Sequence, residues 1–169
     1  MLSQYECISL EKPTAFNGMI QVLAAGFIES WFSLWSHEGG HWFVLTYVLG
    51  KTGFIRGNWT IADPGQTWTR GELTVWGLAG GLITGTLYLI RYYLDSDEED
   101  RLIQLMFGLT HIFYGLLECT VLGRILPISF DMAGIIGMTL ATIVTFAWIH
   151  KRKQDGKPLT IYRSLAKRL

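Results

Sequence analysis

Residues 73–93 read LTVWGLAGGLITGTLYLIRYY and form the clearest structural signal in the chain. A helix of about 20 apolar residues crosses the hydrocarbon core of a bilayer, so this run is long enough to span a membrane. Small residues interrupt it, and such residues let a neighbouring helix approach closely. They are Gly77, Ala79, Gly80, Gly81 and Gly85. The stretch therefore predicts a membrane-spanning helix that packs against another helix.

Three further apolar runs lie at about 16–50, at 103–122, and from about 128 or 132 to 149. The first would be roughly 50 Å long as one helix, whereas the bilayer core is about 30 Å thick. We therefore expect a lead-in over residues 1–26, interfacial or helical, before a span at about 27–49. Together with residues 73–93, these runs predict about four transmembrane helices.

The segment between the first two spans, residues 51–72, differs in character. It is punctuated by Gly, Asn, Pro and Asp and contains the β-prone stretch FIRGNWTI at 54–61. This pattern favours a short β-hairpin. Residues 94–101 are hydrophilic and predict a turn between the second and third spans. The expected fold is an all-α integral membrane protein with a hairpin-like loop after its first span.

The composition agrees with a membrane protein and restricts the class of partner. Half of the residues are hydrophobic, and the formal net charge is zero, which gives no electrostatic basis for nucleic-acid binding. Basic residues concentrate at 150–169, directly after the last apolar run. The positive-inside rule places this tail in the cytoplasm, where it could also contact anionic lipid headgroups. With four spans, both termini then lie in the cytoplasm. The transmembrane core covers residues 27–149, between the lead-in and the basic tail.

The first apolar run contains an ionisable motif, HEGGH at residues 37–41. His37 and His41 lie one helical turn apart, so both imidazoles stand on the same helix face and can occupy two positions on a tetrahedral zinc ion. Glu38 is placed to act as general base on a water that zinc makes more acidic. Ionisable groups at membrane depth are costly and mark functional sites. The motif therefore predicts Zn²⁺ as cofactor and a hydrolytic reaction.

A catalytic zinc site needs a third protein ligand, and the sequence offers three candidates on later spans. They are His111, Glu118 and Asp131. His111 and Glu118 lie two turns apart on one face, so one could be a ligand and the other its hydrogen-bonding partner or a lining residue of a water channel, together with Thr110. Spacing does not choose among them.

Two other interpretations of the motif need no zinc. The histidines could satisfy each other or a carbonyl group inside the bundle. They could also bind haem, with His111 as an axial ligand on the third span, which would give a haem-binding membrane protein. The haem interpretation leaves the adjacent Glu38 unexplained.

The order of three motifs resembles the site-2 protease family of intramembrane zinc metalloproteases. HEGGH at 37–41 matches the first family motif, and GLAGG at 77–81 is similar to a family helix start in which proline is usual at the last position. RILPISFDMAG at 124–134 is similar to the family segment that carries a metal-binding aspartate, here Asp131. Met132 replaces the glycine that normally follows this aspartate, and the usual upstream asparagine is absent.

The resemblance implies hydrolysis of a peptide bond in a membrane-spanning protein substrate, within or near the bilayer. His37, His41 and Asp131 would hold zinc, with Glu118 as the alternative third ligand, and Glu38 would activate water. The hairpin region could pair with an unwound substrate as an added strand. Selection of substrate would rest on the membrane core or on a partner, and the candidate partners besides the substrate and the lipid bilayer are another membrane protein or a second copy in a homo-oligomer. The departures around Asp131 leave an alternative, a catalytically inactive protease-like subunit with a structural or assembly role.

Overall fold

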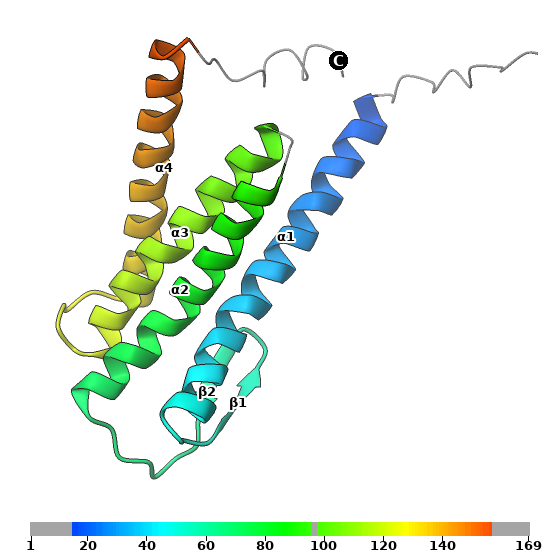
Figure 1. Cartoon of the computed structure of the whole chain (residues 1–169). Coiled ribbons are helices and arrows are strands. Elements are labelled where there is room, and N and C mark those ends of the chain that lie inside the picture. Colours follow the sequence, from blue (N-terminus) through cyan, green and yellow to red (C-terminus); the bar gives the residue numbers. More distant parts are fainter. Residues whose placement is uncertain (1–14, 96–97, 157–169) are drawn as a thin grey trace, which may run out of the picture.

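The computed structural model describes residues 15–95 and 98–156, which form four helices and one hairpin (Figure 1). The elements are α1 (Ala15–Phe43), a π-helical turn (Val44–Val48), β1 (Gly53–Arg56), β2 (Trp59–Ala62), α2 (Arg70–Leu94), α3 (Glu98–Leu122) and α4 (Phe130–Gln154). Helix α2 packs on α1 and on α3, and α4 packs on the far side of α3. The predicted helical fold with a hairpin after the first helix is confirmed.

Three of the described helices are long and apolar enough to cross a membrane. They are α2, α3 from Asp100 onward, and α4, and they coincide with the second, third and fourth expected spans. Helix α1, which carries Glu29 and the HEGGH motif, is not among them. It runs without interruption across residue 27, so the expected lead-in is helical from Ala15 onward.

Most buried apolar side chains are small, and many large apolar side chains are exposed, which is the reverse of the pattern in a soluble protein. Among the described residues, the buried apolar set contains only two large side chains, Leu45 and Tyr88, with Ala79, Cys119, Ala133 and Ala141 as the rest. Large apolar residues are instead exposed, as Ile135, Ile143 and Phe146 are on α4. Exposed apolar surface of this extent, around a core of small residues, is typical of a bundle that faces lipid.

Helices α2 and α3 touch through glycine. A methyl group on Gly77 would lie 2.7 Å from the Cα atom of Cys119, and one on Gly81 would lie 2.7 Å from the backbone nitrogen of Gly115. Real carbon atoms do not approach this closely, so any side chain at these positions would separate the helices. The small residues of the second span therefore do pack against a helix, and the partner is α3.

The hairpin is short and is tied to the end of α1. Gly53 pairs with Ala62 and Arg56 with Trp59, which leaves a two-residue turn whose first residue, Gly57, has a φ of 62°. Gly favours this left-handed conformation because it has no Cβ. Thr60 Oγ1 donates a 2.8 Å hydrogen bond to the carbonyl oxygen of Glu38. The hairpin turn is thereby held beside the HEGGH motif.

A polar cluster joins α1 to α2 at the opposite end of the bundle. The Arg91 guanidinium donates two hydrogen bonds, of 2.8 and 2.6 Å, to the Glu29 carboxylate. The Tyr88 hydroxyl donates to the same carboxylate at 3.0 Å. Paired, hydrogen-bonded charges of this kind are the form in which ionisable groups are tolerated between packed helices.

The ends of the helices carry the expected charges. The acidic stretch expected as a turn contributes the first residues of α3, where negative charge favours a helix start. The basic tail begins inside α4, whose last turn holds Lys151, Arg152 and Lys153. Residues 1–14 of the expected lead-in and 157–169 of the expected tail lie outside the described residues. The first described turn of α1 and the last of α4 lie at the same end of the bundle (Figure 1).

Candidate metal centre

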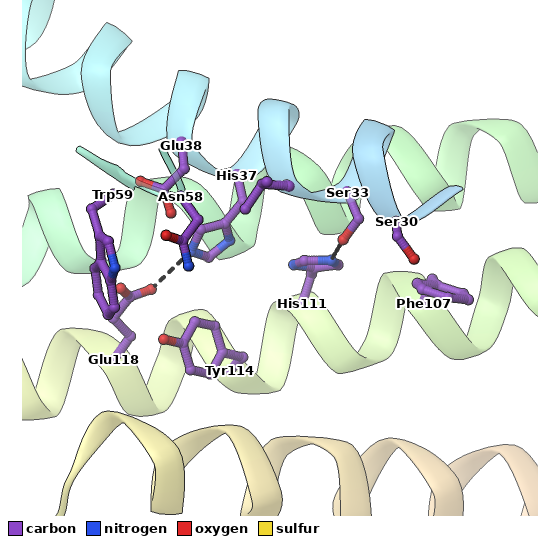
Figure 2. Close-up of a pocket in the computed structure, with 11 residues that line it drawn as sticks. Ser30, Ser33, His37, Glu38, Asn58, Trp59, Phe107, His111, Tyr114 and Glu118 are labelled. Carbon is purple, nitrogen blue, oxygen red and sulfur yellow. Dashed lines mark hydrogen bonds and ion pairs between the residues drawn. The ribbon is translucent and has the colours of Figure 1, made fainter. Parts of the chain in front are cut away.

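The two histidines of the motif meet a glutamate from another helix. His37 Nε2 lies 3.1 Å from His41 Nε2, and the Glu118 Oε2 atom lies 3.2 and 3.3 Å from these two nitrogens. All three side chains are buried, with exposed fractions of 4 to 7 %. Among the described residues, this is the group of histidine, cysteine and acidic side chains that could hold a metal ion. Figure 2 shows His37 and Glu118 facing each other from α1 and α3.

The orientation of His41 is fixed by a backbone carbonyl. His41 Nδ1 lies 2.7 Å from the carbonyl oxygen of Trp76 in α2. A carbonyl oxygen only accepts, so Nδ1 carries the proton, and in the neutral ring Nε2 presents its lone pair. This is the arrangement found in metal-bound histidines, whose second nitrogen donates to a carbonyl or carboxylate. The Trp76 carbonyl therefore orients the His41 ring so that Nε2 can coordinate a metal.

The donor set fits a divalent metal such as zinc. Glu118 Oε2 is buried and makes no hydrogen bond of good geometry, although it lies at ion-pair distance from both nitrogens. Converging lone pairs repel one another unless a cation or a proton lies between them. Two imidazoles and one carboxylate are a known ligand set of catalytic zinc, and tetrahedral ligands about 2.0 Å from zinc lie about 3.3 Å apart. The three observed separations are close to this spacing.

Asp131, the third ligand that the family resemblance implies, is not part of this group. It lies exposed in the first turn of α4, where a carboxylate is favourable near the helix N-terminus. Helix α4 packs on the side of α3 away from α1, whereas the glycine contacts draw α3 tightly onto α2. Glu118, the alternative ligand, is therefore the acidic residue that reaches the histidines.

Glu38 borders a cavity of about 360 Å³ that opens between α1 and α3. His37 and Glu118 line the same cavity, so two of the three donors face it (Figure 2). The Glu38 side chain is 7 % exposed, and its carboxylate makes no hydrogen bond or ion pair within the described part of the chain. A buried carboxylate without a partner needs an explanation. A carboxylate in this position can exchange a proton with a molecule in the cavity.

His111 lines the cavity but is not one of the three donors. Its Nε2 atom is paired with the Ser33 hydroxyl, and its Nδ1 atom is buried without a partner. Its ring centre lies 5.5 Å from that of His37. The expected role of His111 beside the site or in its channel agrees with this position. Thr110, also expected in the channel, is not among the residues that line the cavity.

Seven lining residues were not named from the sequence: Ser30, Ser33, Leu34, Asn58, Trp59, Phe107 and Tyr114. Asn58 and Trp59 belong to the hairpin turn and its second strand, and their position depends on how the hairpin folds back. Tyr114 lies one turn before Glu118 on α3, and this spacing would have identified it once Glu118 was chosen as ligand.

Comparison of the chain with protein-family models, with curated proteins and with solved structures found no match.

Proposed function

We propose that this protein is an intramembrane zinc metalloprotease that hydrolyses a peptide bond of a membrane-spanning substrate. One observation carries the proposal. Two imidazole nitrogens and a carboxylate oxygen converge at 3.1 to 3.3 Å beside Glu38, an acid that faces the same cavity and has no side-chain partner among the described residues. Ionisable groups gathered at such depth in an apolar bundle are too costly to be incidental.

Zinc suits this donor set, with His37, His41 and Glu118 as its ligands. When bound, zinc polarises the substrate carbonyl and lowers the pKa of water toward neutrality. Nitrogen and oxygen donors without a thiolate also admit other divalent metals, so the metal identity is part of the proposal.

The chain's own residues would perform the proton transfers. The Glu38 carboxylate takes a proton from the attacking water and then delivers it to the nitrogen of the leaving amine. The cavity walls between α1 and α3 hold the peptide bond away from bulk water and beside Glu38. A peptide bond in a helix is shielded from attack, so the substrate would unwind and pair with an edge of the hairpin.

In this proposal all four helices lie in the membrane, including α1. The polar residues of α1 from Glu29 to His41 face α2, α3 or the cavity, whereas Phe27, Trp31 and Trp35 are exposed along its outer side. The basic end of α4 would lie in the cytoplasm, and both termini with it.

The proposal is tested with the purified full-length chain in detergent. We expect one zinc per chain by metal analysis and cleavage of designed transmembrane peptides that carry a helix-breaking Gly-Pro pair at different depths. Glu38→Gln should retain zinc and lose at least about 10²-fold in cleavage rate, since general base catalysis contributes about 10²–10⁴-fold. Asp155→Asn, at the exposed end of α4, is the matched acid-to-amide control and should cleave like wild type.

The opposite results distinguish the alternatives. Full zinc loading without cleavage of any peptide in the set would favour an inactive subunit with an assembly role. Cleavage by Glu38→Gln at the wild-type rate would remove Glu38 from the reaction.

A further inference from the structure

Three residues with hydroxyl groups line the cavity beside the metal centre, and the hydroxyl of one of them makes no hydrogen bond to a described residue. Ser33 is paired with His111, and Ser30 also has a partner. Tyr114 lines the cavity, and its hydroxyl makes no hydrogen bond within residues 15–95 and 98–156. In Figure 2 the ring lies below His37, and its hydroxyl points toward the Glu118 side of the cavity. A free phenol beside a reaction centre is a donor without an acceptor.

The backbone and ring of Tyr114 are held firmly. It lies one turn before Glu118 on α3, so its position is fixed relative to the metal ligand. On the other side, a methyl group on Gly137 of α4 would lie 2.9 Å from the Tyr114 backbone nitrogen. Its ring centre is 5.4 Å from that of His37. A donor fixed in this way costs little reorganisation when charge develops nearby.

We propose that Tyr114 is a catalytic residue that donates a hydrogen bond to the carbonyl oxygen of the scissile peptide. This inference rests on the proposed function and adds a residue to it. The oxygen of water adds to the carbonyl carbon while Glu38 takes one proton. The carbonyl oxygen then gains negative charge, and the Tyr114 hydroxyl donates to it. The carbon–nitrogen bond breaks, the carbonyl reforms, and Glu38 returns the proton to the amine.

Asn58 is another hydrogen-bond donor that lines the cavity without a described side-chain partner, and it is less suited to this task. It lies exposed in the two-residue turn of the hairpin, whereas Tyr114 lies on a helix between two neighbours. Donors that stabilise developing charge act through fixed position, and a helix holds a donor more precisely than an exposed turn does. Tyr114 is therefore the residue to test.

The test compares Tyr114→Phe with Tyr93→Phe in the full-length protein. Phe keeps the ring and removes only the hydroxyl, and Tyr93 is 78 % exposed at the far end of α2. On a peptide that wild type cleaves, Tyr114→Phe should lose about 10²–10³-fold in kcat with KM little changed. Zinc content should stay at the wild-type value. Tyr93→Phe should match wild type throughout.

A binding measurement separates catalysis from a structural role. A phosphonamidate analogue of the cleaved peptide carries charged oxygens in tetrahedral geometry, and its affinity should fall by the same factor as kcat/KM. The affinity of the uncleaved peptide for Glu38→Gln should not change when Tyr114→Phe is added. Wild-type turnover by Tyr114→Phe, or unchanged phosphonamidate affinity, would overturn this inference alone. A wild-type protein that neither binds zinc nor cleaves peptide would overturn it together with the proposed function.

Discussion

Replacing Gly80 with alanine is expected to weaken metal binding without unfolding the bundle. An added methyl group on Gly80 would lie 2.6 Å from the Cδ2 atom of His41 and 2.8 Å from the carbonyl oxygen of His37. Ordinary contacts between such atoms begin near about 3.4 Å, so the His41 ring must shift by several tenths of an ångström. Its Nδ1 atom is held by the Trp76 carbonyl, so a shift strains that hydrogen bond or moves Nε2 away from the other donors.

The two effects of the substitution can be estimated separately. Displacing a ligand or its orienting partner costs about 10–100-fold in metal affinity, or about 1.4–2.7 kcal/mol. Overpacking costs about 1–3 kcal/mol of metal-free stability, and replacing a helical glycine by alanine returns about 0.5–1 kcal/mol. The metal-free protein should therefore lose no more than about 2.5 kcal/mol while its zinc affinity falls at least about 10-fold.

Gly39→Ala is the matched control, because Gly39 belongs to the same motif and an added methyl group meets nothing within 4 Å. Zinc affinity would be measured by competition with a fluorescent chelator, and metal-free stability by thermal melting of helical circular dichroism. Gly39→Ala should bind zinc like wild type. Equal zinc affinity in the two variants, within about twofold, would refute the reasoning that Gly80 makes room for His41.

Two further outcomes follow from the contacts of the acidic residues. Glu118→Gln should reduce zinc content to a small fraction of wild type by metal analysis, whereas Asp131→Asn should leave it unchanged; the reverse pattern would restore Asp131 as the ligand. Glu29→Ala removes the acceptor of two hydrogen bonds from Arg91 and should lower stability by about 1–2 kcal/mol, because part of that pair is reached by solvent. A melting temperature equal to wild type would show that this pair does not hold α1 on α2.

The helices and the hairpin could be predicted because local patterns determine them. Apolar runs of bilayer length give the helices, and the Gly-Asn turn between β-prone residues gives the hairpin. The one-turn spacing of His37 and His41 also fixes their common face without any tertiary knowledge.

The third donor, Glu118, was one of three candidates, and the sequence could not choose among them because the choice depends on how the helices pack. The glycines of α2 are visible in the sequence, but their fit against Gly115 and Cys119 of α3 appears only in three dimensions. The hydrogen-bond partner of His41 could not be predicted either. It is the backbone carbonyl of Trp76, and every residue type carries such a group. Family resemblance favoured Asp131, and helix packing brings Glu118 instead.

The two attachments of α1 have a mechanical consequence. The Glu29–Arg91 pair holds the helix at one end and the Thr60–Glu38 hydrogen bond at the other, with His37 between them. An imidazole about 5–6 Å from the helix axis moves about 1.4 Å when the helix turns by about 15°. Metal ligation tolerates only about 0.2 Å. The two attachments oppose such a rotation, so they hold His37 within the tolerance that metal ligation requires.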